Sequence, residues 1–467
     1  MLRVVWPLLV TIVGSVTYVL PAGEPALNIA DHLQLFVDFH LIDKLEGEAE
    51  LRLHRPIMRE VVLVHDQPWE GNTCAYHTIF RDGDIYRMYY RASNHEDGPT
   101  HPSFVCYAES QDGIHWTRPN LGLLEFSGTS DNNIIWEAAG AHNFTPFKDT
   151  NPQCHEDARY KAFGGADKSG LYAFQSPDGI QWRRTGSQPV LTAGAFDSQN
   201  LAFWDGVRSE YRAYFRDLRD GIRDIKTATS PDFLHWSEPV WLEYPGAPKE
   251  HLYTNQILPY YRDPNLFIGF PSRYVPARES LVEGLFMTSR DGRTFRRWQE
   301  AIIRPGPNKD RWYNRSNYIW WGLVETESDL PGDGRELSLY TNERYYKGNG
   351  VKTRRYTYRI DGFVSVHAPF SGGTMRTRPF TFTGSELLLN VATSAAGSVH
   401  VEILDEEGHP IEGFRASDCE DIYGDEIERA VKWKDGGDLS PLQGRAIRLL
   451  FALKDADIYA FRFGDGF

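Results

Sequence analysis

Short segments in which apolar and polar residues alternate recur along most of this chain. Residues 75–80 and 85–91 are two such segments, separated by the charged turn Arg81-Asp82-Gly83-Asp84. Alternation with a period of two predicts strands that bury one face, and the short turn predicts a hairpin. Similar pairs of segments begin near residues 142, 197, 250 and 314. The pattern therefore predicts an all-β protein with five related units.

A turn motif of the form Ser-x-Asp-Gly-x-x-Trp appears between these segments. It occupies residues 110–116 and 176–182; residues 230–236 have Phe233 in place of the glycine, and residues 289–295 are a looser copy that is followed by Trp298. Asp-Gly supplies the positive φ that a tight turn needs, Ser bonds the neighbouring backbone, and Trp offers a broad packing face. A repeat of about 40–60 residues made of short strands is typical of propeller blades. We therefore expect a five-bladed β-propeller in which the motifs are structural.

The repeat ends near Pro369, and a different pattern of strands follows. Residues 380–382, 387–391, 399–404, 447–451 and 459–463 have the spacing of a β-sandwich. The segment 27–59 precedes the first repeat, and we expect it to wrap the edge of the propeller. The predicted organisation is a signal peptide at 1–26, a propeller at 27–368 and a β-sandwich at 369–467.

The first residues have the pattern of an export signal. Met1-Leu2-Arg3 is positively charged, residues 4–20 are almost wholly apolar, and residues 21–26 are rich in small side chains. This pattern predicts a secreted or periplasmic protein with no integral membrane association after cleavage, and an uncleaved N-terminal anchor is the alternative. No other segment is apolar enough to span a bilayer.

Composition narrows the classes of partner. The 467 residues carry a net charge of −14, which argues against nucleic acid as a ligand, and aromatic residues make up 13% of the chain. Four cysteines lie far apart with no metal-binding spacing, so we expect buried thiols, with one disulfide after export as the alternative. The sequence predicts no metal site and no cofactor, and it leaves open a structural calcium ion in the channel.

The segment just before the first strand of each blade, here called the lead-in segment, is where we expect the site. Polar residues at these positions meet at one end of the central channel. The acidic residues there come from three blades, and the predicted catalytic set is Asp66, Glu70, Asp197 and Glu250. Glycosidic cleavage uses two carboxyl groups whose pKa values differ, and separated lead-in segments could supply them.

Further polar and aromatic residues lie in the lead-in segments or at the ends of second strands. The predicted substrate-binding residues are Trp69, Asn72, Asn143, Asn255, Arg273, Asn314, Arg315 and Glu343. Aromatic rings stack on sugar faces, and amide and guanidinium groups bond sugar hydroxyls. The competing interpretation of these residues is that they cap turns or close blades through ion pairs.

The repeated turns and the acidic residues Glu70, Asp197 and Glu250 resemble those of the five-bladed propeller glycoside hydrolases of families 32, 43, 62 and 68. The resemblance covers residues 60–365, and the C-terminal sandwich is similar to the layout of family 32. It implies an Asp of the first blade as nucleophile or base, a second-blade Asp that stabilises the transition state, and a third-blade Glu as acid. This chain departs from the family pattern at two places: His65-Asp66-Gln67-Pro68-Trp69 replaces the Trp-x-Asn-Asp-Pro-Asn-Gly opening of family 32, and blade three has Asp197 where a Glu is expected. The turn motif also resembles the sialidase Asp-box, which has one more residue between Asp and Gly.

These features favour an exported glycoside hydrolase that acts on an oligosaccharide or polysaccharide. The alternatives are a carbohydrate-binding propeller without activity, a sialidase-like enzyme, and an interaction scaffold, because a fold alone does not fix activity. The sugar, the linkage, exo or endo action and the stereochemical outcome stay open. Turnover and binding on a panel of glycans, with Asp197→Asn and Glu250→Gln, would separate these alternatives, and the most useful structural observation is whether Glu70, Asp197 and Glu250 share one pocket.

Overall fold

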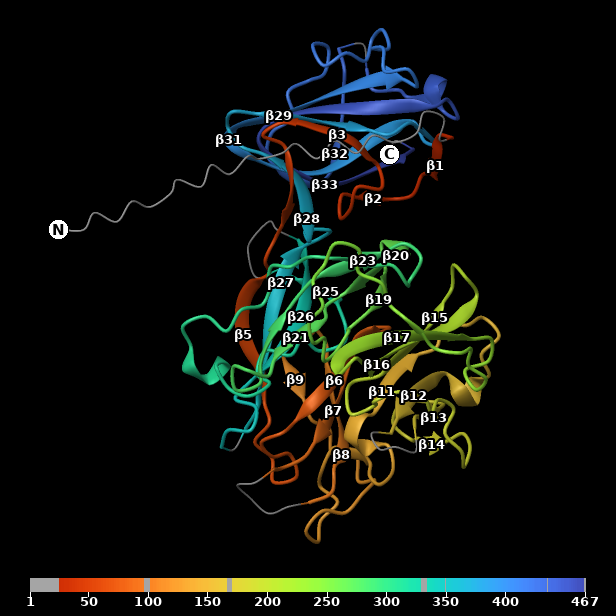
Figure 1. Ribbon diagram of the computed structural model, residues 1–467, viewed down its shortest axis with the longest axis vertical. Helices are drawn as coiled ribbons and strands as arrows, with labels where there is room; N and C mark the ends of the chain where they lie inside the picture. Colours follow the sequence, from red (N-terminus) through yellow and green to blue (C-terminus); the bar gives the residue numbers. More distant parts are fainter. Residues whose placement is uncertain are drawn as a thin grey trace, which may run out of the picture. The chain divides into compact units, whose positions relative to one another are not determined.

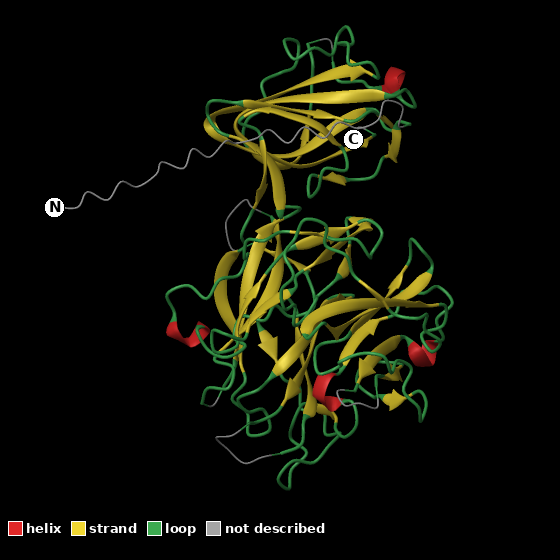
Figure 2. Ribbon diagram, viewed as in Figure 1, coloured by secondary structure: helices red, strands yellow, loops and turns green. Residues whose placement is uncertain are grey.

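The computed structural model describes residues 25–95, 101–165, 170–328, 334–348, 350–434 and 436–465. They form two compact units, one spanning Arg52–Ser365 and the other combining the residues up to Leu51 with those from Val366 onward. Strands make up nearly all of the regular structure (Figure 2). The helical elements described are short 3₁₀ turns at Ala141–Asn143, Glu156–Ala158, Lys309–Arg311 and Ser440–Leu442. The predicted signal peptide lies outside the described residues except for its last two.

Among the described residues, no helix is long and apolar enough to cross a bilayer.

Arg52–Ser365 contains five separate antiparallel sheets, which are the blades (Figure 1). Blade one has β6 (Ala75–Asp82), β7 (Ile85–Ala92), β8 (Phe104–Ser110), β9 (Trp116–Thr117) and β10 (Ile134–Trp136). Blade two has β11 (Thr145–Lys148), β12 (Tyr160–Gly164), β13 (Tyr172–Ser176) and β14 (Arg183–Arg184). Blade three has β15 (Leu201–Asp205), β16 (Glu210–Arg219), β17 (Ile222–Ser230) and β18 (Val240–Trp241). Blade four has β19 (Leu258–Tyr260), β20 (Asp263–Gly269), β23 (Met287–Ser289) and β24 (Arg296–Arg297), with the hairpin β21 (Ser272–Val275) and β22 (Leu281–Gly284) inserted.

Blade five is completed by a strand from the other end of the unit. It contains β25 (Val324–Glu327), β26 (Arg335–Glu343) and β27 (Lys352–Arg359), and its outer strand is β5 (Ile57–Val64). In Figure 1 the red β5 lies beside the cyan β27. Buried Arg355 joins them, because its guanidinium contacts Glu60 at 2.7 Å and Glu336 at 2.8 Å. Pairing between the first and last strands of the unit closes the ring, so the predicted five-bladed propeller is confirmed.

The repeated turn joins the third and fourth strands of a blade. Ser110 Oγ accepts from the N–H of Gly113 at 2.9 Å, and the Trp116 indole donates to the Gly113 carbonyl at 3.1 Å. Gly113 has a φ of 76°, which disfavours any side chain at that position. The Tyr340 hydroxyl of blade five donates to the same carbonyl at 2.6 Å, and its ring lies 6.2 Å from that of Trp116. The motif therefore holds its own turn and also fastens it to the neighbouring blade.

The second unit is a β-sandwich whose strands share one apolar core. It includes β28 (Val364–Ala368), β29 (Gly373–Thr377), β30 (Phe380–Phe382), β31 (Glu386–Asp405), β32 (Asp425–Ala430) and β33 (Ile447–Gly464). β31 and β33 pair along most of their length, with a register break between Thr393 and Ser398. Leu389 and Val401, on either side of this break, are buried in the same core. The two long strands thus contribute to both layers.

The segment 27–59, which we expected to wrap the edge of the propeller, is divided between the units: residues up to Leu51 belong to the sandwich, and the rest leads into β5, the outer strand of blade five. β1 (Leu27–Ala30) pairs with β30, β2 (Gln34–Leu35) with β33, and β3 (Ile42–Gly47) with β29, and the chain continues into β4 (Glu50–Leu53). The physical reason is burial, because Ile29, Phe36 and Leu41 fill the sandwich core.

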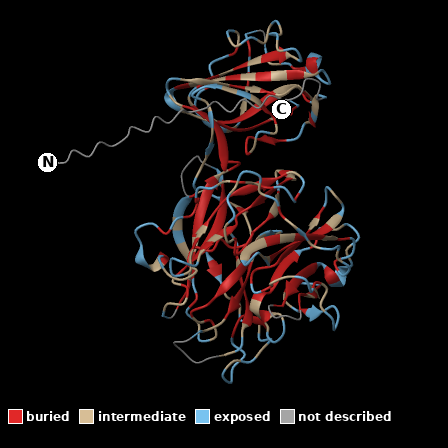
Figure 3. Ribbon diagram, viewed as in Figure 1, coloured by how far each residue is buried: buried red, intermediate tan, exposed pale blue. Residues whose placement is uncertain are grey.

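Burial follows the sheets in both units (Figure 3). All four cysteines are free thiols, and Cys74, Cys106 and Cys419 are buried. The interpretation as buried thiols is therefore confirmed for these three residues, whereas Cys154 is only half-buried.

Candidate functional site

A pocket of about 360 Å³ opens where the lead-in segments meet. Each of the five blades contributes to it through residues just before or at the start of its first strand. These residues are Thr73 and Tyr76 of blade one, His142 of blade two, Asp197 of blade three, Tyr253 of blade four, and Arg315 and Tyr318 of blade five. The lead-in segments therefore converge as the sequence analysis predicted.

The ends of second strands add to the same pocket. In an antiparallel blade, the end of the second strand lies beside the start of the first. Arg91 and Ser93 lie at the end of β7, and Tyr345 and Tyr346 follow β26. Blades one and five thus contribute both positions, whereas blades two, three and four contribute only their lead-in segments, and aromatic and basic side chains predominate.

Asp197 is the only carboxylate among the described residues that line this pocket. Its side chain is 58% exposed, and its Oδ1 lies 3.1 Å from His142 Nε2. The hydrogen bond from His142 is the main cause that lowers the pKa of Asp197 to about 2; burial opposes it, and the charges of Arg216 and Arg91 assist. Asp197 is therefore ionised at any physiological pH.

The turn that presents Asp197 is fixed by buried amides. Asn143 Nδ2 donates to the carbonyls of Phe196 at 2.8 Å and Ser198 at 3.1 Å, on either side of Asp197. Asn200 Nδ2 donates to the same two carbonyls, each at 2.9 Å. Both amides are fully buried. Asn143, predicted to bind substrate, thus holds the backbone around the pocket carboxylate.

Arg91 and His142 form the floor beside Asp197. Arg91 donates to the Thr73 carbonyl at 2.8 Å and to the Tyr345 hydroxyl at 2.5 Å, and its Nη1 lies 3.1 Å from His142 Nε2. Burial and the Arg91 charge lower the pKa of His142 below 6.5, so its ring is neutral at pH 7. With its proton on Nε2, the neutral His142 ring donates a hydrogen bond to Asp197 Oδ1. Arg91 Nη1 then donates to the His142 carbonyl at 3.5 Å. The neutral ring thereby links a buried cation to an exposed anion.

Tyrosine rings form the walls. The rings of Tyr253 and Tyr318 are 5.4 Å apart, and those of Tyr345 and Tyr346 are 4.6 Å apart. Burial raises the pKa of Tyr318 well above 10, so its phenol keeps its proton. Such walls offer flat apolar faces together with hydroxyl groups, and this combination suits the faces and edges of a sugar ring.

Several residues that line the pocket have left-handed backbone conformations. The φ angles are 55° at Tyr76, 56° at Arg315 and 63° at Tyr346. A side chain in this region costs about 1–2 kcal/mol, and such strain persists where the surrounding structure imposes it, often at functional sites. Three strained positions around one pocket indicate that side-chain placement there was favoured over backbone stability.

The structure does not bring the predicted acids together. Glu70 is fully buried and is bound by Tyr90 Oη at 2.6 Å, Arg118 Nε at 2.9 Å and His65 Nδ1 at 3.2 Å. Asp66 is an exposed side chain 3.9 Å from the same Arg118. Neither lines the pocket that contains Asp197. Glu70 therefore joins side chains inside blade one, and Asp66 is an exposed residue beside the arginine that Glu70 binds.

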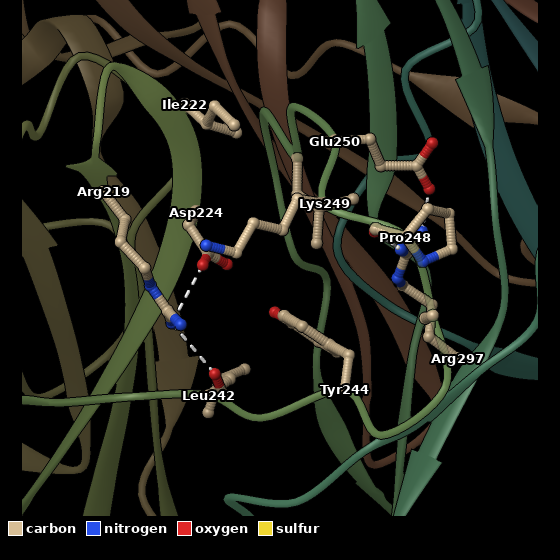
Figure 4. A pocket seen from close by; sticks show the side chains of 11 residues that line it. Arg219, Ile222, Asp224, Leu242, Tyr244, Pro248, Lys249, Glu250 and Arg297 are labelled. Carbon is tan, nitrogen blue, oxygen red and sulfur yellow. Dashed lines mark hydrogen bonds and ion pairs between the residues drawn. The ribbon is translucent and has the colours of Figure 1, made fainter.

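Glu250 lines a different pocket, of about 190 Å³, between blades three and four (Figure 4). Its carboxylate contacts Arg297 and lies 2.6 Å from Arg273 Nε. Asp224, in the same pocket, pairs with Arg219 at 2.8 Å. Burial raises the pKa of Asp224, whereas hydrogen bonds from Arg273 and Arg297 overcome burial and lower that of Glu250. Glu250 and Arg273 are thus bound to each other, outside the pocket of Asp197.

The other predicted binding residues support the pocket from behind or lie apart from it. Asn72 Nδ2 donates to the His95 carbonyl at 2.8 Å, which holds a segment that lines the pocket. The Trp69 indole donates to Asn133 at 2.8 Å, and Asn255 contacts the Tyr214 carbonyl at 3.4 Å.

Two predictions from blade five fall outside the pocket, and one falls inside. Buried Glu343 pairs with Arg354 at 2.5 Å, and Asn314 is absent from the lining, whereas Arg315 beside it is part of it. Asp197 and Arg315 are therefore the two predicted residues that share the site, and a catalytic or binding role for each stays a prediction.

Sequence reasoning missed the residues that dominate the lining. Arg91, Tyr345 and Tyr346 lie at the ends of second strands, a position that had been considered only for Arg273 and Glu343. His142 had been seen only as the start of blade two. The end of the second strand, if it had been considered in every blade, is the sequence signal that would have identified Arg91, Tyr345 and Tyr346.

Comparisons with known proteins give limited matches. No family model matches the sequence. Two uncharacterized proteins of Mycobacterium tuberculosis, from strains CDC 1551 and H37Rv, are 27% identical over 143 and 148 residues. Each match covers 30% of this chain and 42% of the relative, so this chain spans less than half the length of the curated relatives it matches.

Solved structures with a similar arrangement include several carbohydrate-active enzymes. One is described as a glycoside hydrolase, with 14% identity, a TM-score of 0.46, and 65% of this chain and 92% of that chain covered. A thermostable family-43 glycoside hydrolase has 13% identity and a TM-score of 0.43, covering 65% and 96%. The GH32 β-fructofuranosidase of Bombyx mori has 10% identity and a TM-score of 0.41, covering 89% and 95%.

Proposed function

We propose that the protein binds carbohydrate in the pocket formed by the lead-in segments and acts there on a glycosidic bond, with Asp197 as its ionised carboxylate. The observation that carries the proposal is the placement of Asp197. It is the pocket carboxylate, it is exposed to the pocket space, and buried Asn143 and Asn200 fix its turn. A carboxylate held in this way can act as base or nucleophile, or stabilise a developing positive charge.

The same geometry favours a second candidate, a propeller that binds carbohydrate without cleaving it. Glycosidic cleavage ordinarily needs a proton donor whose pKa is near the working pH, in addition to the ionised group. Among the described lining residues no second carboxyl group is present, and the buried Tyr318 phenol is too weak an acid. Binding by stacking and hydrogen bonds would need neither group.

A panel of oligosaccharides separates the two candidates. Turnover is followed by release of reducing sugar and binding by calorimetry, for the wild type, Asp197→Asn and Asp66→Asn. We expect the Asp197 variant to lose turnover by about a hundredfold or more, because the ionised group is removed. Asp66→Asn has the same chemical change at an exposed residue outside the pocket, and it should match the wild type.

Each other outcome decides between the candidates. Binding without turnover in the wild type would establish the carbohydrate-binding propeller and exclude the hydrolase. Turnover that is equal in Asp197→Asn and the wild type would contradict the proposed role of Asp197. Absence of both binding and turnover over the whole panel would reject carbohydrate as the ligand class.

We also propose that the protein is exported. The support is the apolar pattern of residues 4–20 and the small residues that follow it. N-terminal sequencing of the secreted or periplasmic protein should place the mature end between Pro21 and Leu27. Recovery of the chain from the cytoplasm with Met1 intact would contradict this proposal.

A further inference from the structure

Guanidinium groups without a carboxylate partner gather around one side of the pocket. The guanidinium carbons of Arg216, Arg223 and Arg315 lie 4.7, 5.3 and 5.8 Å from the centre of the Tyr253 ring. Within the described part of the chain, none of the three forms an ion pair with Asp or Glu. Three like charges around one ring repel each other. The charge of Arg216 acts on Asp197, and a further anion beside Arg315 would reduce the remaining repulsion.

Other arginines of the propeller show how unusual this is. Arg273 and Arg297 share Glu250, and Arg311 and Arg354 share Glu343. The buried cations of this fold thus generally have a carboxylate within ion-pair distance. Among the described residues, Arg216, Arg223 and Arg315 have no carboxylate within ion-pair distance, although the chain as a whole carries an excess of acidic residues.

Two donors inside the pocket lack any hydrogen-bond partner. Tyr318 is 1% exposed, and its hydroxyl is buried without a partner. The Nε of Arg315 is also buried without a partner, while its Nη1 donates to the Tyr346 hydroxyl at 2.8 Å. Both residues line the pocket. A buried polar group without a partner costs free energy, and a ligand acceptor would remove that cost.

The chemistry of these donors identifies the acceptor. A guanidinium edge bonds a planar oxyanion through two parallel N–H groups, and a phenol adds a third donor. The described lining contains two arginines, Arg91 and Arg315, against the single carboxylate Asp197. All the donor nitrogens of Arg91 already contact Thr73, Tyr345 or His142. Arg315 is therefore the cation that is free to bind a ligand.

We propose that Arg315 and Tyr318 form an oxyanion subsite that binds the carboxylate of an acidic sugar. This proposal rests on the pocket being a carbohydrate site and narrows its ligand to a hexuronic acid or a similar carboxylated sugar. Asp197 repels the carboxylate, so the ligand is oriented with its acidic group toward blade five and its neutral hydroxyls toward blade three. The left-handed backbone at Arg315 is then part of the cost of presenting its side chain.

The test compares matched sugars. Glucuronic and galacturonic acids, glucose, galactose and inorganic phosphate are titrated calorimetrically into the full-length protein at low and moderate salt. We expect each uronic acid to bind at least about tenfold tighter than its neutral counterpart, since a charge-assisted bond is added. The preference should weaken as salt rises.

Variants assign the preference to the subsite. Arg315→Gln should weaken uronate binding at least about tenfold more than it weakens binding of the neutral sugars, so that the preference is lost. Arg315→Lys, which keeps the charge but not the paired donors, should retain only part of it. Tyr318→Phe should weaken uronate binding severalfold. Arg81→Gln is the control, because Arg81 is an exposed residue at the β6–β7 turn, outside the pocket.

The outcomes separate this proposal from the preceding one. A uronate preference that persists in Arg315→Gln, or that Arg81→Gln reduces equally, overturns the subsite. Equal binding of acidic and neutral sugars overturns it while the pocket remains a carbohydrate site. Binding of phosphate without binding of either uronic acid overturns the assignment to an acidic sugar. If no sugar binds at all, the proposed function fails and this proposal fails with it.

Discussion

Glu70 allows a direct test of which acids build the propeller and which serve the pocket. We expect Glu70→Gln to destabilise the propeller by about 3 kcal/mol at pH 7. The substitution keeps the size of the side chain but removes the charge that faces Arg118 at 2.9 Å. It also replaces one of two oxygens, both of which accept hydrogen bonds, by an NH₂ group that can only donate. Because Glu70 lies outside the pocket, ligand binding by the folded variant should be unchanged.

The lowered pKa of Glu70 sets the size of the effect. Burial opposes ionisation, but the hydrogen bond and charge of His65, the charge of Arg118 and the bond from Tyr90 together lower the pKa from 4.5 to about 2. One pKa unit corresponds to about 1.4 kcal/mol, so the shift contributes roughly 3 kcal/mol. A depressed pKa stabilises the protein fully above the unfolded value of 4.5. The contribution then declines as pH falls toward 2, and it is about half gone near pH 3.

Urea unfolding followed by tryptophan fluorescence between pH 7 and pH 3 measures this. Fluorescence reports mainly on the propeller, because Trp433 is the only tryptophan among the described residues of the sandwich unit. The stability gap between wild type and Glu70→Gln should be constant down to about pH 5 and then narrow. Asp66→Asn is the matched control. It removes an exposed charge 3.9 Å from the same arginine, and we expect a change below about 1 kcal/mol.

Two results would refute this reasoning. A gap that does not change with pH would show that lost packing, not the charge, causes the destabilisation. A Glu70→Gln variant that is as stable as Asp66→Asn, but has lost turnover, would return Glu70 to the catalytic role that the sequence suggested.

Three further predictions follow from the structure. Asn143→Ala should weaken Asp197-dependent binding by about tenfold in calorimetry, because the bonds to the carbonyls on either side of Asp197 are lost, and unaltered binding would contradict that positioning role. Ligand binding that depends on Asp197 should stay constant from pH 7 to pH 4, since its pKa is about 2, and a decline in this window that Asp197→Asn abolishes would be inconsistent with that value. Gly113→Ala should lower the free energy of unfolding, measured in urea, by about 2–3 kcal/mol, because the added Cβ would lie 2.9 Å from Thr326. Gly83 is equally left-handed but has no atom nearby, so Gly83→Ala should lower it by about 1 kcal/mol. Equal losses would contradict the interblade role of Gly113.

The fold could be predicted from the sequence because its determinants are local. In the turn at residues 110–116, Ser110 and Asp112 bond to backbone groups within three residues, so the motif shapes the turn wherever it occurs. The same chemistry tolerates Phe233 in place of glycine, at a φ of 70°, because its ring is buried and stacks on Phe163 of blade two. Local turn chemistry, repeated with alternating strands, is sufficient to indicate blades.

The N-terminal segment and the acids could not be predicted in this way, because their partners are distant in sequence. Phe36 packs with Phe451 and Phe461, more than 400 residues away, and nothing in the segment itself distinguishes a propeller edge from a sandwich core. Glu70 is paired with Arg118, and only the tertiary structure shows that this carboxylate is occupied. An acid in a lead-in segment is a candidate until its long-range partner is known.

The lead-in segments share a feature that explains both the success and the errors of the site prediction. Each contains one buried asparagine, and the five are Asn72, Asn143, Asn200, Asn255 and Asn317, none more than 1% exposed. An amide both donates and accepts, so it can bond the irregular backbone that precedes a strand, which a carboxylate cannot do. The lead-in residues that line the pocket lie within four positions of these asparagines. The polar lead-in pattern therefore indicates where the pocket lies, while its asparagines form the frame and their neighbours line the pocket.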